Sequence, residues 1–175
     1  MRNHNLAFID IETTGLNVLI HEIIEVGCVM TTPDFKIIEE FELKIKPEHI
    51  ENADKVALKI NGYDEANWKS AYTMEKAIKI LTRKVKDSIM VGHNVAFDSG
   101  FLEHAFAKTG IENTLHYHKL DTVSIAWAKL HKEPDLEHFS LRELGTRFGI
   151  KNPHAHTALS DARATFELYK KLMSI

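Results

Sequence analysis

The sequence is poor in cysteine, has no excess of positive charge and contains no long apolar run. Cys28 is the only cysteine among 175 residues, which excludes an internal disulfide framework and a cysteine-based zinc site. With 22 Lys and Arg against 25 Asp and Glu, the formal net charge is −3. We therefore do not expect a protein that holds long duplexes by charge alone, whereas binding of a short strand at a metal site remains open.

The composition favours one folded domain over residues 1–175, since hydrophobic residues make up 44% and charged residues 27%. The first apolar run extends only from Leu6 to Ile9 and stops at Asp10. It is too short for a signal peptide or a membrane helix. Together with the single cysteine, this predicts a cytoplasmic protein with no membrane partner.

The hydrophobic pattern predicts an α/β fold. Three β-rich segments come first, over 6–11, 23–31 and 35–45, and a turn at Pro33-Asp34 joins the last two. The pattern then changes to alternating helices and short strands. We expect helices over 53–60, 73–85, 97–108, 122–130, 140–148 and 158–173, and strands over 89–92 and 118–121. This order predicts a mixed sheet, antiparallel in its first three strands and parallel afterwards, flanked by helices.

Two acids, Asp10 and Glu12, close the first apolar strand. Side chains at positions i and i+2 of a strand share one face, so both carboxylates point the same way. Such close like charges raise each other's pKa unless a cation neutralises them, and a hard divalent cation suits oxygen ligands. The alternatives are a strand whose end simply emerges into solvent, and a glycosidase pair, although nothing else indicates a sugar cleft.

Asp98 and Asp161 are two further candidate acids. Asp98 falls in the first turn of a helix that follows a short strand, where an ordinary first-turn acid with Asn94 as cap is the alternative. Asp161 lies at the edge of the apolar stripe of the last helix. A charge there is unfavourable unless it is paired or bound to metal; otherwise Asp161 is a tolerated boundary residue.

His156 is the candidate general base, because a histidine beside carboxylates can accept a proton near neutral pH. It lies five residues before Asp161, so the two do not share a face of a continuous helix. They converge if the helix begins after Thr157 as N-cap. His154 is the rival if the helix begins at Pro153, and a surface histidine is the simplest alternative.

Three segments together resemble a known family. Residues 10–15 (DIETTG), 93–98 (HNVAFD) and 156–162 (HTALSDA) resemble the three motifs of the DEDD-type 3′–5′ exonucleases. The spacing of His156 and Asp161 resembles the histidine (DEDDh) branch. The segment Ser140-Leu141-x-x-Leu144-Gly145 is similar as well. This family includes the proofreading exonuclease subunits of bacterial DNA polymerase III, RNA-trimming enzymes and oligoribonucleases.

The resemblance implies an RNase H-like fold and hydrolysis of phosphodiester bonds from the 3′ end of single-stranded DNA, RNA or short oligonucleotides. It implies release of nucleoside 5′-monophosphates by a two-metal mechanism with His156 as the base. Two divalent cations, Mg²⁺ or Mn²⁺, balance the charge of the implied metal ligands, which are Asp10, Glu12, Asp98 and Asp161. A non-catalytic nucleic-acid-binding or scaffold domain and an endonuclease are the alternatives.

The resemblance also implies the residues that hold the terminal nucleotide, although Phe97 could equally be a core residue. They are Thr13, Thr14, Leu16, Asn94 and Phe97. Partners consistent with the family are a DNA polymerase, a replication or repair assembly, or a second copy of the chain. The chain ends at Ile175, soon after the last expected helix, which favours a protein without a polymerase-binding tail. The motifs do not decide between DNA and RNA.

Overall fold

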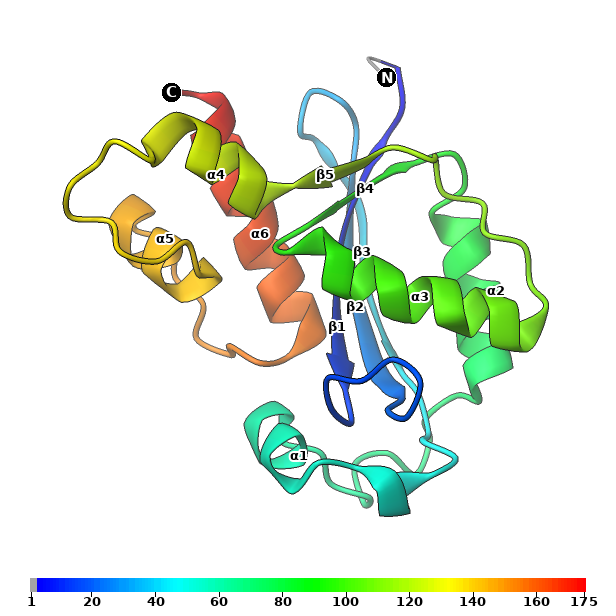
Figure 1. The fold of residues 1–175 in the computed structure, drawn as a ribbon. Helices are drawn as coiled ribbons and strands as arrows, with labels where there is room; N and C mark the ends of the chain where they lie inside the picture. The colour runs from blue at the N-terminus through cyan, green and yellow to red at the C-terminus, as the bar shows by residue number, and fades with distance from the viewer. Residues whose placement is uncertain (1–2) are drawn as a thin grey trace.

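The computed structural model describes residues 3–175, which fold around one five-stranded sheet (Figure 1). The strand order is β3-β2-β1-β4-β5. β1 pairs antiparallel with β2 and β2 with β3, whereas β1–β4 and β4–β5 are parallel. The strands are β1 (Leu6–Thr13), β2 (Ile23–Thr31), β3 (Ile37–Lys44), β4 (Ile89–Gly92) and β5 (Lys119–Asp121). The predicted mixed sheet is confirmed.

The helices begin and end within two residues of the predicted positions. They are α1 (Lys55–Asn61), α2 (Met74–Lys84), α3 (Val95–Thr109), α4 (Thr122–Leu130), α5 (Leu141–Phe148) and α6 (Ala158–Met173). A short 3-10 helix over Ile50–Asn52 was not expected from the pattern. No helix among residues 3–175 combines the length and the apolar character that crossing a bilayer requires.

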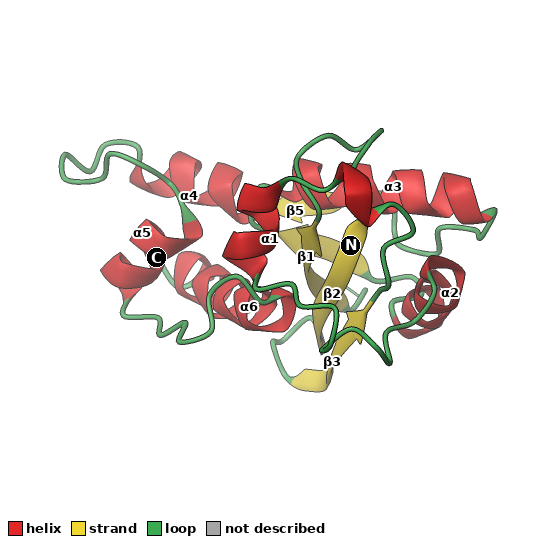
Figure 2. Ribbon diagram, turned by 90° about the horizontal axis from the view of Figure 1, so that it is seen from below, coloured by secondary structure: helices red, strands yellow, loops and turns green. Residues whose placement is uncertain are grey.

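The two faces of the sheet pack against different helices, on opposite sides in Figures 1 and 2. On β1, Ala7 and Ile9 belong to the core cluster that also includes buried residues of α2 and α3. Leu6 and Phe8 instead share a cluster with Phe166 of α6. Because side chains alternate along a strand, residues 10 and 12 fall on the face that α6 covers.

Gly27 of β2 lets α6 begin very close to the sheet. It is paired with Asp10 of β1, and a Cβ atom at Gly27 would lie 2.1 Å from the carbonyl carbon of Ala158. Any side chain there would push the first turn of α6 away from β1. The backbone N–H of Ala158 also donates a hydrogen bond to Glu25 Oε1 at 2.8 Å. Both contacts hold the start of α6 over the C-terminal end of β1.

Candidate active site

Asp10 and Glu12 lie near the end of β1, on the face covered by α6. In the antiparallel register Asp10 is opposite Gly27, and Glu12 is opposite Glu25. A small residue opposite the first acid leaves room for the helix. The two carboxylates therefore stand beside the first turn of α6, as the alternation along the strand predicts.

Asp98 reaches the same place from α3. Asp98 lies in the first turn of that helix and is only 3% exposed. Its Oδ1 accepts a hydrogen bond from the backbone N–H of Ile11 at 3.1 Å. Ile11 separates Asp10 and Glu12 in sequence, so this hydrogen bond fixes the third carboxylate beside the other two. α3 can begin here because β4, which precedes it, runs parallel to β1.

Asp121 caps two helices at this edge of the sheet. Its Oδ1 accepts the backbone N–H groups of Asn94 and Val95 at the start of α3, at 2.9 and 3.3 Å. Its carboxylate also accepts the N–H groups of Val123 and Ser124 in α4. The side chain of Asn94 makes no capping hydrogen bond. Asp121 is therefore a structural acid, and its capping bonds lower its pKa although burial acts in the opposite direction.

Asp161 and His156 come together because α6 begins after Thr157. Asp161 Oδ2 accepts the backbone N–H of His156 at 3.1 Å, and His156 adopts a left-handed conformation with φ of 67°. Ligand atoms of Glu12, His156 and Asp161 lie within 4.8 Å of one another. His154 instead lines a separate cavity with Glu25.

Asn152 is a residue of this site that the sequence did not indicate. Its side-chain amide donates to Asp161 Oδ1, and its own Oδ1 accepts a hydrogen bond from Ser160 Oγ at 2.6 Å. These bonds tie the loop that carries His156 to the first turn of α6. Nothing in the spacing of an asparagine nine residues before an acid would have predicted the contact.

Glu25 is a second residue that the sequence analysis missed. It is 2% exposed and lies opposite Glu12. Burial, with the nearby charge of Glu42 adding to it, raises the pKa of Glu25 to about 7, while the hydrogen bond from Ala158 acts in the opposite direction. A charged residue within an otherwise apolar β segment was the available signal.

Burial makes Asp10, Glu12 and Asp98 difficult to ionise, and repulsion from neighbouring carboxylates adds to this effect. Burial raises the pKa of Asp10 well above its usual range, and the charges of Asp98, Asp161 and Glu12 add to this effect. Burial likewise raises the pKa of Glu12 to about 8 and that of Asp98 to about 7. Such a set of hard oxygen donors fits Mg²⁺ or Mn²⁺, whose positive charge would favour the ionised forms.

These pKa shifts predict how the stability of the metal-free protein depends on pH. The folded-state pKa values of Glu12 and Asp98 lie above their ordinary values of 4.5 and 3.8. Between about pH 4 and pH 8 the folded chain therefore holds more protons than the unfolded chain, and its free energy of unfolding falls as the pH rises. We expect the melting temperature in EDTA to decrease over this interval.

Manganese should increasingly offset that loss as the pH rises, because it binds the ionised carboxylates of the folded state. Thermal melts in EDTA and in 1 mM Mn²⁺, from pH 5 to pH 8, measure both effects. A manganese-induced stabilisation that does not grow with pH would contradict this description of the acids.

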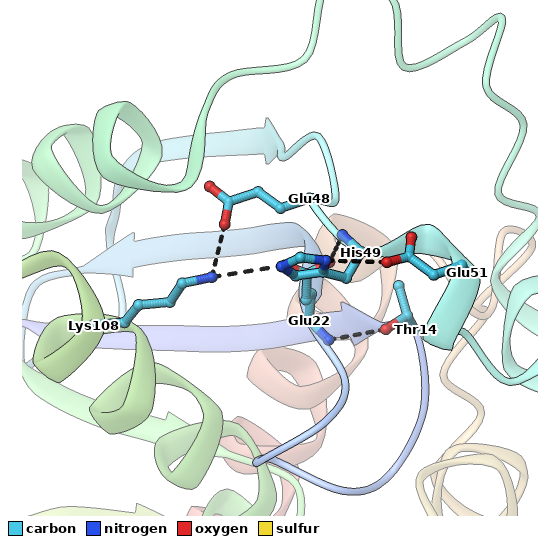
Figure 3. Close-up of polar contacts among 6 residues, drawn as sticks. All are labelled: Thr14, Glu22, Glu48, His49, Glu51 and Lys108. Atoms are coloured by element: carbon cyan, nitrogen blue, oxygen red, sulfur yellow. Dashed lines mark hydrogen bonds and ion pairs between the residues drawn. The ribbon is translucent and has the colours of Figure 1, made fainter.

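The turn after β1 is held by hydrogen bonds of its own threonines and of Glu22. Thr13 Oγ1 donates to the carbonyl of Gly15 at 2.7 Å, and Thr14 Oγ1 accepts the N–H of Glu22 at 2.9 Å. Figure 3 shows how Glu22 anchors the far side of the turn: its Oε2 accepts the N–H of His49 at 2.8 Å, and its Oε1 lies 3.8 Å from Lys108 Nζ.

The candidate nucleotide-binding side chains differ in their exposure. Thr13 and Thr14 are buried, whereas Leu16 is 81% exposed at the tip of the turn. Asn94 is exposed. Phe97 is half-buried, packs against the core and has its ring centroid 5.0 Å from that of Phe101. Leu16 and Asn94 are thus accessible to a ligand. Whether Phe97 contacts the terminal nucleotide or serves only as a core residue stays a prediction.

Comparison with known proteins supports the family assignment. The model of the exonuclease family (RNase T type) matches residues 7–169. A PolC-type DNA polymerase III from Caldanaerobacter subterraneus subsp. tengcongensis is 34% identical over 166 residues, which cover 94% of this chain and 11% of that protein. The chain thus spans about a tenth of the length of this relative.

Solved structures share the fold. An exonuclease I structure superposes with a TM-score of 0.86 at 19% identity and covers 98% of this chain and 41% of that one. The zinc-bound form of the E. coli exonuclease I complex with single-stranded DNA gives a TM-score of 0.84 at 20% identity, with the same coverage. The RNase H-like fold that the family resemblance implied is therefore confirmed. With its family match over residues 7–169, the chain belongs to the exonuclease family, as its DEDD-type motifs predicted.

Proposed function

We propose that this chain is a metal-dependent 3′–5′ exonuclease that acts on single-stranded DNA, RNA or short oligonucleotides. The observation that carries this proposal is the convergence of residues from three distant segments. β1 supplies Asp10 and Glu12, α3 supplies Asp98, and α6 with its preceding loop supplies Asp161 and His156. Membership of the exonuclease family supports the same chemistry.

Asp10, Glu12, Asp98 and Asp161 would hold two divalent cations, Mg²⁺ or Mn²⁺. When bound, such a pair supplies Lewis-acid stabilisation of the attacking and leaving oxygens of an in-line displacement. Within the chain, the N–H of Ile11 orients Asp98, and Asn152 orients Asp161. These contacts limit how far the ligands must reorganise on binding.

His156 would accept the proton of the attacking water. The water oxygen forms a bond to phosphorus, and the bond from phosphorus to the 3′ oxygen of the preceding nucleotide breaks. The products are a nucleoside 5′-monophosphate and a strand shortened by one nucleotide. The exposed Leu16 would contact the terminal base, since an apolar face accepts bases without regard to sequence.

The similarity to a PolC-type DNA polymerase III supports the proposal of a polymerase context. We propose that this domain removes 3′-terminal nucleotides in association with a DNA polymerase or a replication or repair assembly. Self-association as a homodimer stays a prediction. Both are tested by measuring the mass of the complexes that the purified chain forms alone and with a polymerase.

The decisive assay uses a 5′-labelled single-stranded oligonucleotide. We expect stepwise shortening in Mn²⁺ and none in EDTA, and we expect a circular single strand of the same sequence to stay intact, because an exonuclease needs an end. Cleavage of the circle would indicate an endonuclease. Binding of the linear strand without any shortening would instead support the non-catalytic nucleic-acid-binding alternative.

A further inference from the structure

Two cavities flank the first turn of α6. One, of about 430 Å³, lies on the β2–β3 side, and its lining includes Glu25, Glu42 and Lys44. The other, of about 550 Å³, lies between α5, α6 and the loop that joins them, and its lining includes His156 and Asp161. A strand whose scissile phosphate reaches the acids could continue into either cavity.

The charges of the first cavity do not favour a phosphate. Its lining contains two carboxylates, those of Glu25 and Glu42. Its cations are already engaged: Lys44 Nζ lies 3.9 Å from Glu42, and Arg163 makes two hydrogen bonds to Glu40, at 2.9 and 3.1 Å. A phosphate entering this cavity would meet acids and would compete with existing ion pairs.

The charges of the second cavity, between α5 and α6, do favour a phosphate. Arg142 lines it, and among residues 3–175 no acid lies within ion-pairing distance of the Arg142 guanidinium. Asp161, already assigned as a metal ligand, is the one acid in the lining. Apart from His156, the remaining lining residues are apolar or carry uncharged polar side chains; they include Leu141, Ile150, Ala155, Ser140 and Thr146. An unpaired guanidinium beside an apolar surface suits a nucleotide.

We propose that Arg142 binds a phosphate of the substrate strand on the 5′ side of the scissile bond, and that this cavity holds the corresponding nucleotide. This inference rests on the proposed function. A 3′–5′ exonuclease removes the terminal nucleotide, so every phosphate other than the scissile one lies on the 5′ side. The cavity that contains both Arg142 and the residues around Asp161 therefore receives the part of the strand that remains after cleavage.

The family resemblance does not itself assign this role. In the segment Ser140-Leu141-x-x-Leu144-Gly145, Arg142 occupies a position that the pattern leaves unspecified. The proposed role of Arg142 therefore rests on the cavity that it lines, and it is separate from the roles proposed for the metal ligands and the base.

Arg147 offers a matched control. It lies in the same helix, but it is paired with Glu133 and does not line the cavity. We expect Arg142→Gln to raise KM for a single-stranded oligonucleotide about 10-fold with kcat nearly unchanged, because a charge-assisted phosphate contact is lost. The slope of log KM against log salt should fall by about 0.7. Arg147→Gln should change neither quantity.

A single neutral methylphosphonate, moved along the strand, identifies the phosphate. In the wild-type chain, one position 5′ of the scissile bond should raise KM for the first cleavage. In the Arg142→Gln variant, a methylphosphonate at that position should not raise KM further. Both changes remove the same contact between Arg142 and the phosphate. Equal KM values for the two arginine variants, or additive penalties at every position, would overturn the inference. Failure of the wild-type chain to shorten any strand would instead overturn the proposed function.

Discussion

Asp10→Asn is expected to reduce kcat by about 10³-fold or more, since one metal ligand is lost from a site that stabilises the transition state. The same change should raise the melting temperature of the metal-free protein by about 2–4 °C at pH 8, which corresponds to about 1 kcal/mol for a chain of this size. The stabilisation arises because Asp10 is half-buried, which disfavours its charge, and because it lies beside Asp98, Asp161 and Glu12, whose charges repel its own. Single-turnover cleavage and thermal melts in EDTA measure the two effects.

Asp135→Asn is the matched control, because Asp135 is an exposed acid in the loop before α5. It should leave both kcat and the metal-free melting temperature close to those of the wild type. If Asp10→Asn retained wild-type activity, or destabilised the metal-free chain as a simple packing defect would, the assignment of Asp10 to the metal site would be wrong.

His156→Asn is expected to lower kcat by about 10²–10⁴-fold, the usual contribution of general acid–base catalysis. Asparagine tolerates the left-handed backbone that His156 adopts at φ of 67°. The backbone N–H that donates to Asp161 also remains in the variant. The substitution therefore removes the imidazole while preserving the hydrogen bond that holds the loop.

His154→Asn provides the comparison, since His154 is also exposed in the same loop but lines the cavity on the far side of α6. Its kcat should stay within about twofold of the wild-type value, as for other surface substitutions. Parallel single-turnover assays in saturating Mn²⁺ compare the two variants. A larger loss for His154→Asn would identify it as the base, and equal small losses would show that neither histidine acts as one.

The elements could be predicted because their hydrophobic periods are strong and their boundaries carry caps. α4 and α6 begin at the predicted residues, where Asp121 and Thr157 precede them. The position of Asp10 and Glu12 on one face follows from strand alternation alone. Thr157, however, makes no capping hydrogen bond in the structure. The N–H of Ala158 is instead satisfied by Glu25 of β2, a partner that only the tertiary fold provides.

The supporting contacts of the site could not be predicted for the same reason. Asn152 reaches Asp161 because the loop after α5 turns back towards α6, and no local pattern specifies that path. The approach of α6 to β2 depends on Gly27, which in the sequence is one small residue within an apolar strand. The sequence therefore identifies the candidate ligands one residue at a time. Contacts between residues of distant elements, which the sequence pattern does not show, determine where those ligands meet.

Anomalous diffraction from a crystal soaked in Mn²⁺ tests the central claim most directly, because it reports which side chains surround an ion. We expect manganese peaks bounded by Asp10, Glu12, Asp98 and Asp161, with the His156 imidazole facing them. Ordered carboxylates with no peak among them at a saturating concentration of manganese would contradict the account.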